Sequence, residues 1–259
     1  MLACPTMSDY LRELFSLDGR RALVTGGSSG IGYAIAEAIG RAGAEVVVVA
    51  RRQAELDKAV TRLREHGVTA SWISADLAGR DDIRRVCAAA GDIDILVNDA
   101  GNNIRKPMAE LTVEDYERTI AVNLTAPYLL GQHFGPRMAA RGWGRIINLG
   151  SQQSISAFGD SGAYGAAKAA IAGLTRSQAE AWSADGVCVN TIIPGFVLTP
   201  LTAPAQAIPG RVEALAARHM VRRNGVPEDF AGAAVFLAGD ASAFVTGQML
   251  FVDGGFSVH

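Results

Sequence analysis

Seven short runs rich in β-branched and other apolar residues alternate along this chain with longer amphipathic segments. The runs cover residues 21–25, 45–50, 70–74, 94–98, 145–149, 187–192 and 249–252. Several are apolar at successive positions, which is typical of parallel strands covered on both faces. Because consecutive parallel strands need a crossover, the segments between them are expected to be helices. We predict an α/β fold of the Rossmann type, with a doubly wound, mostly parallel seven-stranded sheet and helices on both faces.

The helical pattern is clearest over residues 31–42, 53–65, 81–90 and 163–184. No linker, repeat or low-complexity tract divides the 259 residues, and 49% of them are hydrophobic, so we expect a single domain over 1–259. The segment 200–225 combines three prolines, two glycines and several basic residues. It is interpreted as a mobile insertion, either a substrate lid or an irregular surface excursion.

Charge and hydropathy exclude several classes of protein. A net charge of −2 argues against a nucleic-acid partner, which needs a clustered basic surface. No apolar run reaches the ~20 residues of a membrane span, so no membrane partner is expected. The first ten residues lack the features of a secretory signal, and Met7 is as good a start as Met1.

Neither the cysteines nor the histidines have the spacing of a metal site, so no metal is expected. The cysteines are odd in number and far apart, which favours a reducing cytoplasm over a disulfide framework: Cys4, Cys87 and Cys188. Three histidines are interpreted as surface groups: His66, His133 and His219.

A glycine-rich turn, T-G-G-S-S-G-I-G over residues 25–32, joins the first strand to the first long helix. Glycine allows backbone angles closed to other residues and lets the main chain approach a ligand closely. The N-terminus of the following helix offers free N–H groups to a pyrophosphate. The spacing differs from the common G-x-G-x-x-G fingerprint, so a plain tight turn is the alternative. Its position after the first strand favours dinucleotide binding.

The end of the second strand carries Arg51 and Arg52 and no acidic residue. An acid there holds the ribose hydroxyls of NAD, whereas arginine accommodates the extra phosphate of NADP. Ser29 is neutral where a second phosphate-binding base would otherwise stand. NADP is therefore favoured over NAD, although both arginines could simply be solvated.

Tyr164 and Lys168 are spaced i and i+4, which places them on one face of a helix. A tyrosine with an ordinary pKa of ~10 needs about 4 kcal/mol of preference for the phenolate to act as a base near neutrality. The Lys168 ammonium and a positively charged nicotinamide ring are the expected sources. An ordinary surface pair is the alternative.

With these motifs in this order, the chain resembles the single-domain branch of the short-chain dehydrogenase/reductase superfamily, from about Gly19 to the C-terminus. Asp76-Leu77 is similar to the pair that meets the adenine ring, and Asn123 to the asparagine of the central helix. Ser151 stands thirteen residues before Tyr164, the spacing of the family's serine.

The resemblance implies a cofactor site and a catalytic set. The cofactor site would comprise Gly26, Ser28, Ser29, Gly30, Ile31, Gly32, Arg51, Arg52, Asp76, Leu77, Asn98, Ala100, Gly101, Tyr164, Lys168, Pro194, Gly195, Val197 and Thr199. Tyr164 would exchange the alcohol proton, and Ser151 would hydrogen-bond the substrate oxygen. Lys168 would lower the tyrosine pKa and hold the nicotinamide ribose, and Asn123 would position a water that links Lys168 to solvent. A homotetramer is also implied.

One residue departs from the family pattern. The family shows Asn-Asn-Ala-Gly after the fourth strand, and this chain has Asn98-Asp99-Ala100-Gly101. The carboxylate of Asp99 is expected to change local hydrogen bonding or cofactor affinity without removing a catalytic group.

Polar residues gather where the substrate should lie: Asn102, Asn103, Arg105, Gln152, Gln153 and Ser154. The expected substrate contacts are Asn103, Arg105, Ser151, Gln153 and Tyr164. Amides suit hydroxyl groups, and Arg105 suits a carboxylate. Residues 103–107 also resemble those of gluconate and deoxygluconate dehydrogenases. We predict NAD(P)-dependent hydride transfer to or from a sugar, polyol or sugar acid. A 3-oxoacyl thioester or small-ketone reductase and a non-catalytic dinucleotide sensor are the alternatives.

Overall fold

A single parallel sheet organises the chain in this computed structural model, which describes residues 7–259. Its strands are β1 Arg21–Thr25, β2 Glu45–Ala50, β3 Ala70–Ser74, β4 Ile95–Asn98, β5 Gly144–Leu149, β6 Val187–Pro194 and β7 Met249–Val252. The order is β3-β2-β1-β4-β5-β6-β7, and every neighbouring pair is parallel. The predicted doubly wound α/β fold is confirmed.

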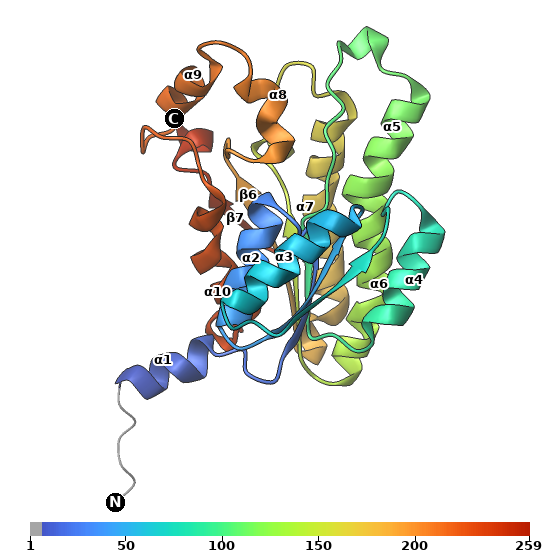
Figure 1. Cartoon of the computed structure of the whole chain (residues 1–259), viewed down its shortest axis with the longest axis vertical. Coiled ribbons are helices and arrows are strands. Elements are labelled where there is room, and N and C mark those ends of the chain that lie inside the picture. The colour runs from blue at the N-terminus through green and yellow to red at the C-terminus, as the bar shows by residue number, and fades with distance from the viewer. Residues whose placement is uncertain (1–6) are drawn as a thin grey trace, which may run out of the picture.

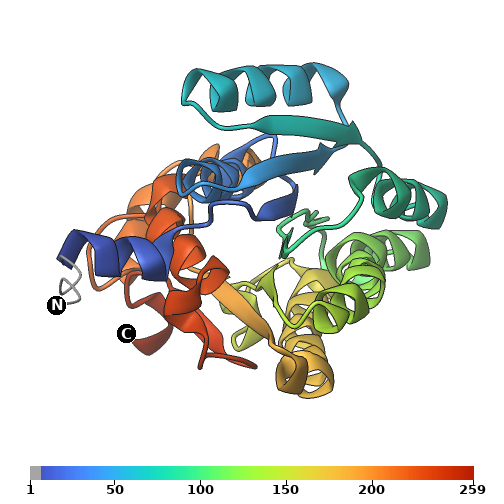
Figure 2. The same cartoon turned by 90° about the horizontal axis from the view of Figure 1, so that it is seen from below.

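Helices connect the strands and cover both faces of the sheet (Figures 1 and 2). The described α-helices are α1 Met7–Phe15, α2 Gly30–Arg41, α3 Gln53–Glu65, α4 Arg80–Ala90, α5 Val113–Ile120, α6 Ala126–Ala140, α7 Gly162–Trp182, α8 Ala203–Gln206, α9 Arg211–Arg218 and α10 Ala231–Ala238. The first of them projects away from the body of the molecule (Figure 1).

The core lies on both faces because successive strand residues point to opposite sides. On one face, Val46 and Val48 of β2 join a buried cluster with side chains of α2, α3 and α10. On the other, Val47 and Val49 join a second cluster with side chains of α4, α6 and α7. This double burial explains why the strand is apolar at successive positions.

Three strand boundaries differ from the sequence prediction, and β5 differs only in starting one residue earlier, at Gly144. Asp94 lies outside β4, and its carboxylate accepts a hydrogen bond from the backbone N–H of Arg21 (3.0 Å). The last strand residue before the site is Pro194, which pairs with Val252, so β6 is longer than expected.

The segment 200–225 is largely helical rather than irregular. It contains a 3₁₀ turn, Pro200–Thr202, followed by α8 and α9, and it lies over one end of the sheet (Figure 1). A bridge between Val197 and Gly225 closes the segment at its base. The idea that it moves as a lid stays a prediction.

His219 corrects one expectation, because it is buried and not a surface group. The backbone N–H of Phe196 donates to its Nε2 (3.3 Å). Its Nδ1 lies 2.8 Å from the carbonyl oxygen of Leu215. Since Nε2 accepts, Nδ1 carries the hydrogen, and the neutral ring ties the end of α9 to the chain after β6.

Further features of the described residues concern membrane-spanning helices, metal-binding clusters and cysteines. Within 7–259, no helix combines the length and apolarity that a membrane crossing requires. The same residues contain no group of three or more candidate metal-binding side chains. Cys87 and Cys188 are free and buried, and Cys4 lies outside the described residues.

Candidate active site

Two adjoining cavities lie at the carboxyl end of the sheet, where ligands bind in doubly wound folds. The first borders the glycine turn and the ends of β2 and β3, and the second borders Ser151, the start of α7 and the chain after β6. They share wall residues, namely Ile31, Asp99, Gly101, Thr199 and Leu201. The pair therefore forms one elongated site, as an extended dinucleotide requires.

The glycine turn gives the first cavity an open, N–H-lined end. Gly26 and Gly30 have φ angles of +73° and +59°, which other residues rarely adopt. A Cβ atom on Gly26 would lie 2.8 Å from Oδ2 of Asp99 and 3.0 Å from the backbone nitrogen of Ala100. Because α2 begins at Gly30 and Ser29 makes no side-chain capping bond, the N–H groups of Gly30 and Ile31 are left for a ligand.

Cationic side chains border the same cavity beside the end of β2. Arg51 and Arg52 are exposed, and within residues 7–259 neither guanidinium forms an ion pair or donates a hydrogen bond. Two unpaired guanidinium groups fit the extra phosphate of NADP. The residues present therefore fit this cofactor at both the phosphate turn and the ribose end.

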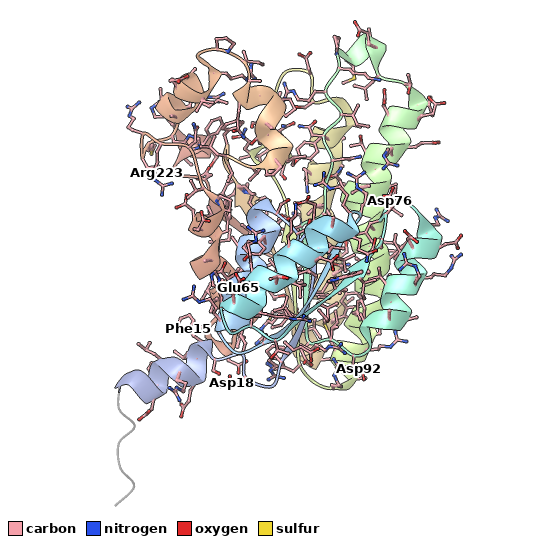
Figure 3. All side chains as sticks on the ribbon, in the orientation of Figure 1. Phe15, Asp18, Glu65, Asp76, Asp92 and Arg223 are labelled. Carbon is pink, nitrogen blue, oxygen red and sulfur yellow. The ribbon has the colours of Figure 1, made fainter. Side chains whose placement is uncertain are left out.

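Asp76 and Leu77 line the far end of this cavity, where the family resemblance places the adenine ring. Figure 3 labels Asp76. Its carboxylate accepts from the guanidinium of Arg118 (3.1 Å) and from the N–H of Ala78 (3.1 Å). Arg118 also lines the cavity and was missed from the sequence, although it lies five residues before Asn123 on the same helical stretch.

Tyr164 and Lys168 lie on α7, are both buried and line the second cavity. Lys168 Nζ lies 5.6 Å from the centroid of the Tyr164 ring and donates to the carbonyl oxygen of Leu149 (2.7 Å). Ser151 accepts from the N–H of Gln153 (3.2 Å) and is hydrogen-bonded to the phenol of Tyr164. The predicted trio is thus together in one place.

The pKa of Tyr164 moves in the direction opposite to the one expected from Lys168. Burial raises the pKa of Tyr164 to about 12, and the Ser151 hydrogen bond only partly opposes this rise. Burial also lowers the pKa of the Lys168 ammonium to about 8. Lys168 by itself therefore does not bring the phenol near neutrality, because desolvation dominates in an enclosed site.

Asn123 lies behind the cavity wall in a π-helical turn, Ala121–Thr125. Its amide nitrogen donates to the carbonyl oxygens of Asn102 (2.9 Å) and Thr119 (2.9 Å). Its Oδ1 is buried without a hydrogen-bond partner among the described residues, so its acceptor capacity is unused. Single π turns of this kind are frequent at functional sites.

Gly32 and Asn98 also lie behind the wall, although both were predicted to bind cofactor. Asn98 donates through Nδ2 to Oδ1 of Asn148 (2.8 Å), and Asn148 donates through its own Nδ2 to Oγ1 of Thr175 (2.9 Å). This buried chain of polar groups joins β4, β5 and α7. In this structure Asn98 holds elements together, and its contact with cofactor stays a prediction.

The substrate end of the second cavity is less polar than expected. Asn103, Arg105 and Gln153 line it, but Ser154 is used internally, donating to the backbone oxygen of Lys168 (2.8 Å). Sequence reasoning missed the lining residues Phe158, Phe196, Leu201, Thr202, Pro204 and Ala205. Most of them belong to the segment after β6, where no motif marks a side chain as facing a cavity.

Comparison with known proteins gives the family. Residues 26–257 match the family model described as enoyl-(acyl carrier protein) reductase. The chain is 39% identical over 250 residues to a gluconate 5-dehydrogenase of Gluconobacter oxydans (strain 621H). That alignment covers 95% of this chain and 98% of the relative. The similarity therefore extends over both cavities.

Solved structures agree over nearly the whole length. A protein of Beutenbergia cavernae, described as an NAD(P)-dependent gluconate 5-dehydrogenase with bound NADP, is 40% identical with a TM-score of 0.91. It matches over 95% of this chain and 99% of its own. A gluconate 5-dehydrogenase of Burkholderia cenocepacia, in complex with NADP and tartrate, is 36% identical with a TM-score of 0.89, over 96% and 99% of the two chains.

These full-length relatives are enzymes, so the alternative of a non-catalytic dinucleotide sensor is dropped. The sheet order, the glycine turn and the full-length matches agree with one another. This chain belongs to the short-chain dehydrogenase/reductase family and is a dehydrogenase that acts on CH–OH groups.

Proposed function

We propose that the protein oxidises a secondary alcohol of a sugar acid, sugar or polyol with NADP, using Tyr164 as the acid/base. The observation that carries this proposal is the composition of the second cavity. Tyr164, Ser151 and Lys168 line it together with Asn103, Arg105 and Gln153. One side can thus hold the reacting C–O group, while amide and guanidinium groups are available to a polar substrate.

Four residues of the chain have different roles in the proposed reaction. Ser151 holds the substrate oxygen against the phenol of Tyr164, which takes the alcohol proton. Lys168 holds the nicotinamide ribose, and the unpaired Oδ1 of Asn123 keeps a water within reach of Lys168. When bound, oxidised NADP would supply the hydride acceptor and a positive charge in the site. That charge is needed because burial alone keeps the phenol protonated.

Arg105 gives the cavity its preference for a carboxylate. Its guanidinium donates to the carbonyl oxygen of Gly159 (2.6 Å) and lies 5.6 Å from the centroid of the Phe158 ring. These contacts fix the side chain and still leave donors for a substrate anion, since guanidinium carries five N–H groups. The buried Oδ1 of Asn103, unpaired among the described residues, accepts from a substrate hydroxyl.

The apolar part of the cavity favours a second candidate, a reductase of 3-oxoacyl thioesters or small ketones. Phe158, Phe196 and Leu201 border the cavity and suit an acyl chain. Initial rates measured by nicotinamide absorbance distinguish the two. The proposal expects reduction of NADP by gluconate-type acids, aldoses or polyols. Activity only with a 3-oxoacyl thioester and NADPH would favour the second candidate instead.

Replacing Arg105 tests the carboxylate contact. We expect Arg105→Met to raise KM about 10-fold or more for a sugar acid, because a charge-assisted contact worth ~1.5–3 kcal/mol is lost. KM should change little for the polyol with the same carbon chain, which lacks the carboxylate. Lys106→Met is the matched control, since Lys106 is paired with Asp115 (2.5 Å). Equal losses for acid and polyol would contradict this role.

A further inference from the structure

The Asp99 side chain occupies the junction between the two cavities and is on the wall of both. Its backbone N–H and that of Ala100 both donate to Oγ1 of Thr25 (3.1 Å each), so the chain after β4 is fixed to the end of β1. This anchoring sets the direction of the carboxyl group.

The glycine turn closes around that carboxyl group. The Asp99 carboxylate accepts a hydrogen bond from the backbone N–H of Gly32. A Cβ atom on Gly32 would lie 2.5 Å from Asp99 Oδ2, and one on Gly26 2.8 Å away. The two glycines therefore leave room for an acid beneath the turn, where it meets the positive end of α2.

Charged groups lie on both walls that Asp99 joins. The first cavity carries Arg51, Arg52, Asp76 and Arg118, and the second carries Arg105, Lys168 and the titratable Tyr164. Of the charged groups, Lys168 is the one that acts on the pKa of Asp99. Tyr164 and Lys168 lie on α7, share the wall of the second cavity with Asp99 and interact with it electrostatically. The glycine turn between β1 and α2 contributes only backbone groups and neutral side chains. The charge of Asp99 thus acts mainly on the catalytic pair.

We propose that Asp99 is a positioning residue of the hydride-transfer site: its carboxylate is the counter-ion of the Lys168 ammonium and sets the pH range in which Tyr164 exchanges its proton. The inference rests on the proposed role of Tyr164. An asparagine at this position could fill the space but carries no charge. It could therefore neither act as the counter-ion of Lys168 nor set the pH range of Tyr164.

The titration behaviour of the three groups supports this arrangement. Burial raises the pKa of Asp99 to about 7, although Lys168 and the Gly32 N–H act to lower it. The Asp99 carboxylate opposes the lowering of the Lys168 pKa by burial. It also adds to the rise in the Tyr164 pKa. Between the pKa values of Asp99 (about 7) and Lys168 (about 8), the ionised acid therefore accompanies a charged Lys168 and favours the protonated form of Tyr164.

The sign of the expected effect follows. Removing the negative charge lowers the pKa of Tyr164, because its phenolate no longer faces an anion, and lowers the pKa of Lys168, because its ammonium loses a counter-ion. In Asp99→Asn, both limbs of the pH profile of kcat/KM for alcohol oxidation should move to lower pH, by about one unit. A merely structural role would reduce the rate and leave the limbs in place.

The test compares wild type, Asp99→Asn and Asp99→Ser, with Asp81→Asn as control because Asp81 is an exposed acid on α4. Alongside the pH profiles, NMR of ring-labelled tyrosine follows Tyr164 directly, its signal being assigned by its absence in Tyr164→Phe. We expect both limbs of the pH profile and the Tyr164 titration to shift in Asp99→Asn and in Asp99→Ser. Neither should shift in Asp81→Asn. Folded variants with unmoved limbs would overturn the inference.

If both variants fail to fold, the NMR titration of the wild-type protein still tests the inference. The Tyr164 signal should then show an inflection near neutral pH as Asp99 ionises. A titration without that inflection would overturn the inference. Retained turnover in Tyr164→Phe would instead contradict the proposed function. Because the NMR titration does not depend on turnover, the two failures are distinguishable.

Discussion

The two halves of the site are built from different parts of the chain. The phosphate half consists mainly of backbone: two glycines with positive φ and the start of α2. The catalytic half consists of side chains from α7, the chain after β4 and the segment after β6. Backbone groups bind a ligand common to many enzymes, whereas side chains can vary independently. The difference indicates that cofactor binding and chemistry can be damaged separately.

The largest effect on turnover that leaves cofactor binding nearly intact is expected from Lys168→Met, in the catalytic half. The substitution preserves much of the buried volume and removes the ammonium, so kcat should fall about 10²–10⁴-fold. Binding of NADP, measured by fluorescence titration, should weaken far less, because the glycine turn is unchanged. A loss in affinity as large as the loss in kcat would contradict the division into two halves.

A loss of NADP binding with a smaller change in kcat is expected from Gly26→Ala, in the phosphate half. The new Cβ would lie 2.8 Å from Asp99 Oδ2 on a residue with φ of +73°, so the turn must distort. Strain of ~1–3 kcal/mol corresponds to about 10- to 100-fold weaker binding of NADP. The kcat at saturating cofactor should change less. Thermal unfolding measured in parallel separates a loss of binding from a loss of fold.

A smaller effect is expected from Arg51→Ala, at the edge of the phosphate half. An exposed guanidinium that contacts the extra phosphate of NADP should contribute about tenfold in kcat/KM. The value for NADP should fall by that factor while the value for NAD stays nearly constant. Arg52→Ala, measured in the same way, shows which arginine makes the contact. Equal losses with both cofactors would argue against a phosphate contact.

The same contrast explains how much could be predicted from sequence. The strand runs and the turn over 25–32 were predictable because periodicity and glycine spacing act locally. Burial of His219 was not, because its partners are the backbone atoms of Phe196 and Leu215, brought together only by the fold. The pairing of Arg118 with Asp76 joins residues 42 positions apart. Neither leaves a local signal.

The grouping of Tyr164, Lys168 and Ser151 was predictable for a different reason. Tyr164 and Lys168 share one helix face, and Ser151 lies thirteen residues earlier, so spacing and family resemblance sufficed. Spacing could not give the sign of the Tyr164 pKa shift, which depends on how completely the fold encloses the phenol. The apolar wall from Phe158 and Leu201 was hidden for the same reason.

The most direct test of the account compares wild type with Tyr164→Phe, following NADP reduction in the presence of a gluconate-type acid and measuring NADP affinity in both proteins. Loss of the phenolic hydroxyl removes the proposed acid/base and leaves the ring that fills the cavity wall. We predict that turnover falls at least about 10²-fold, while NADP affinity stays within about twofold, since the phosphate half is untouched. Turnover by Tyr164→Phe at a rate close to that of wild type would contradict the account.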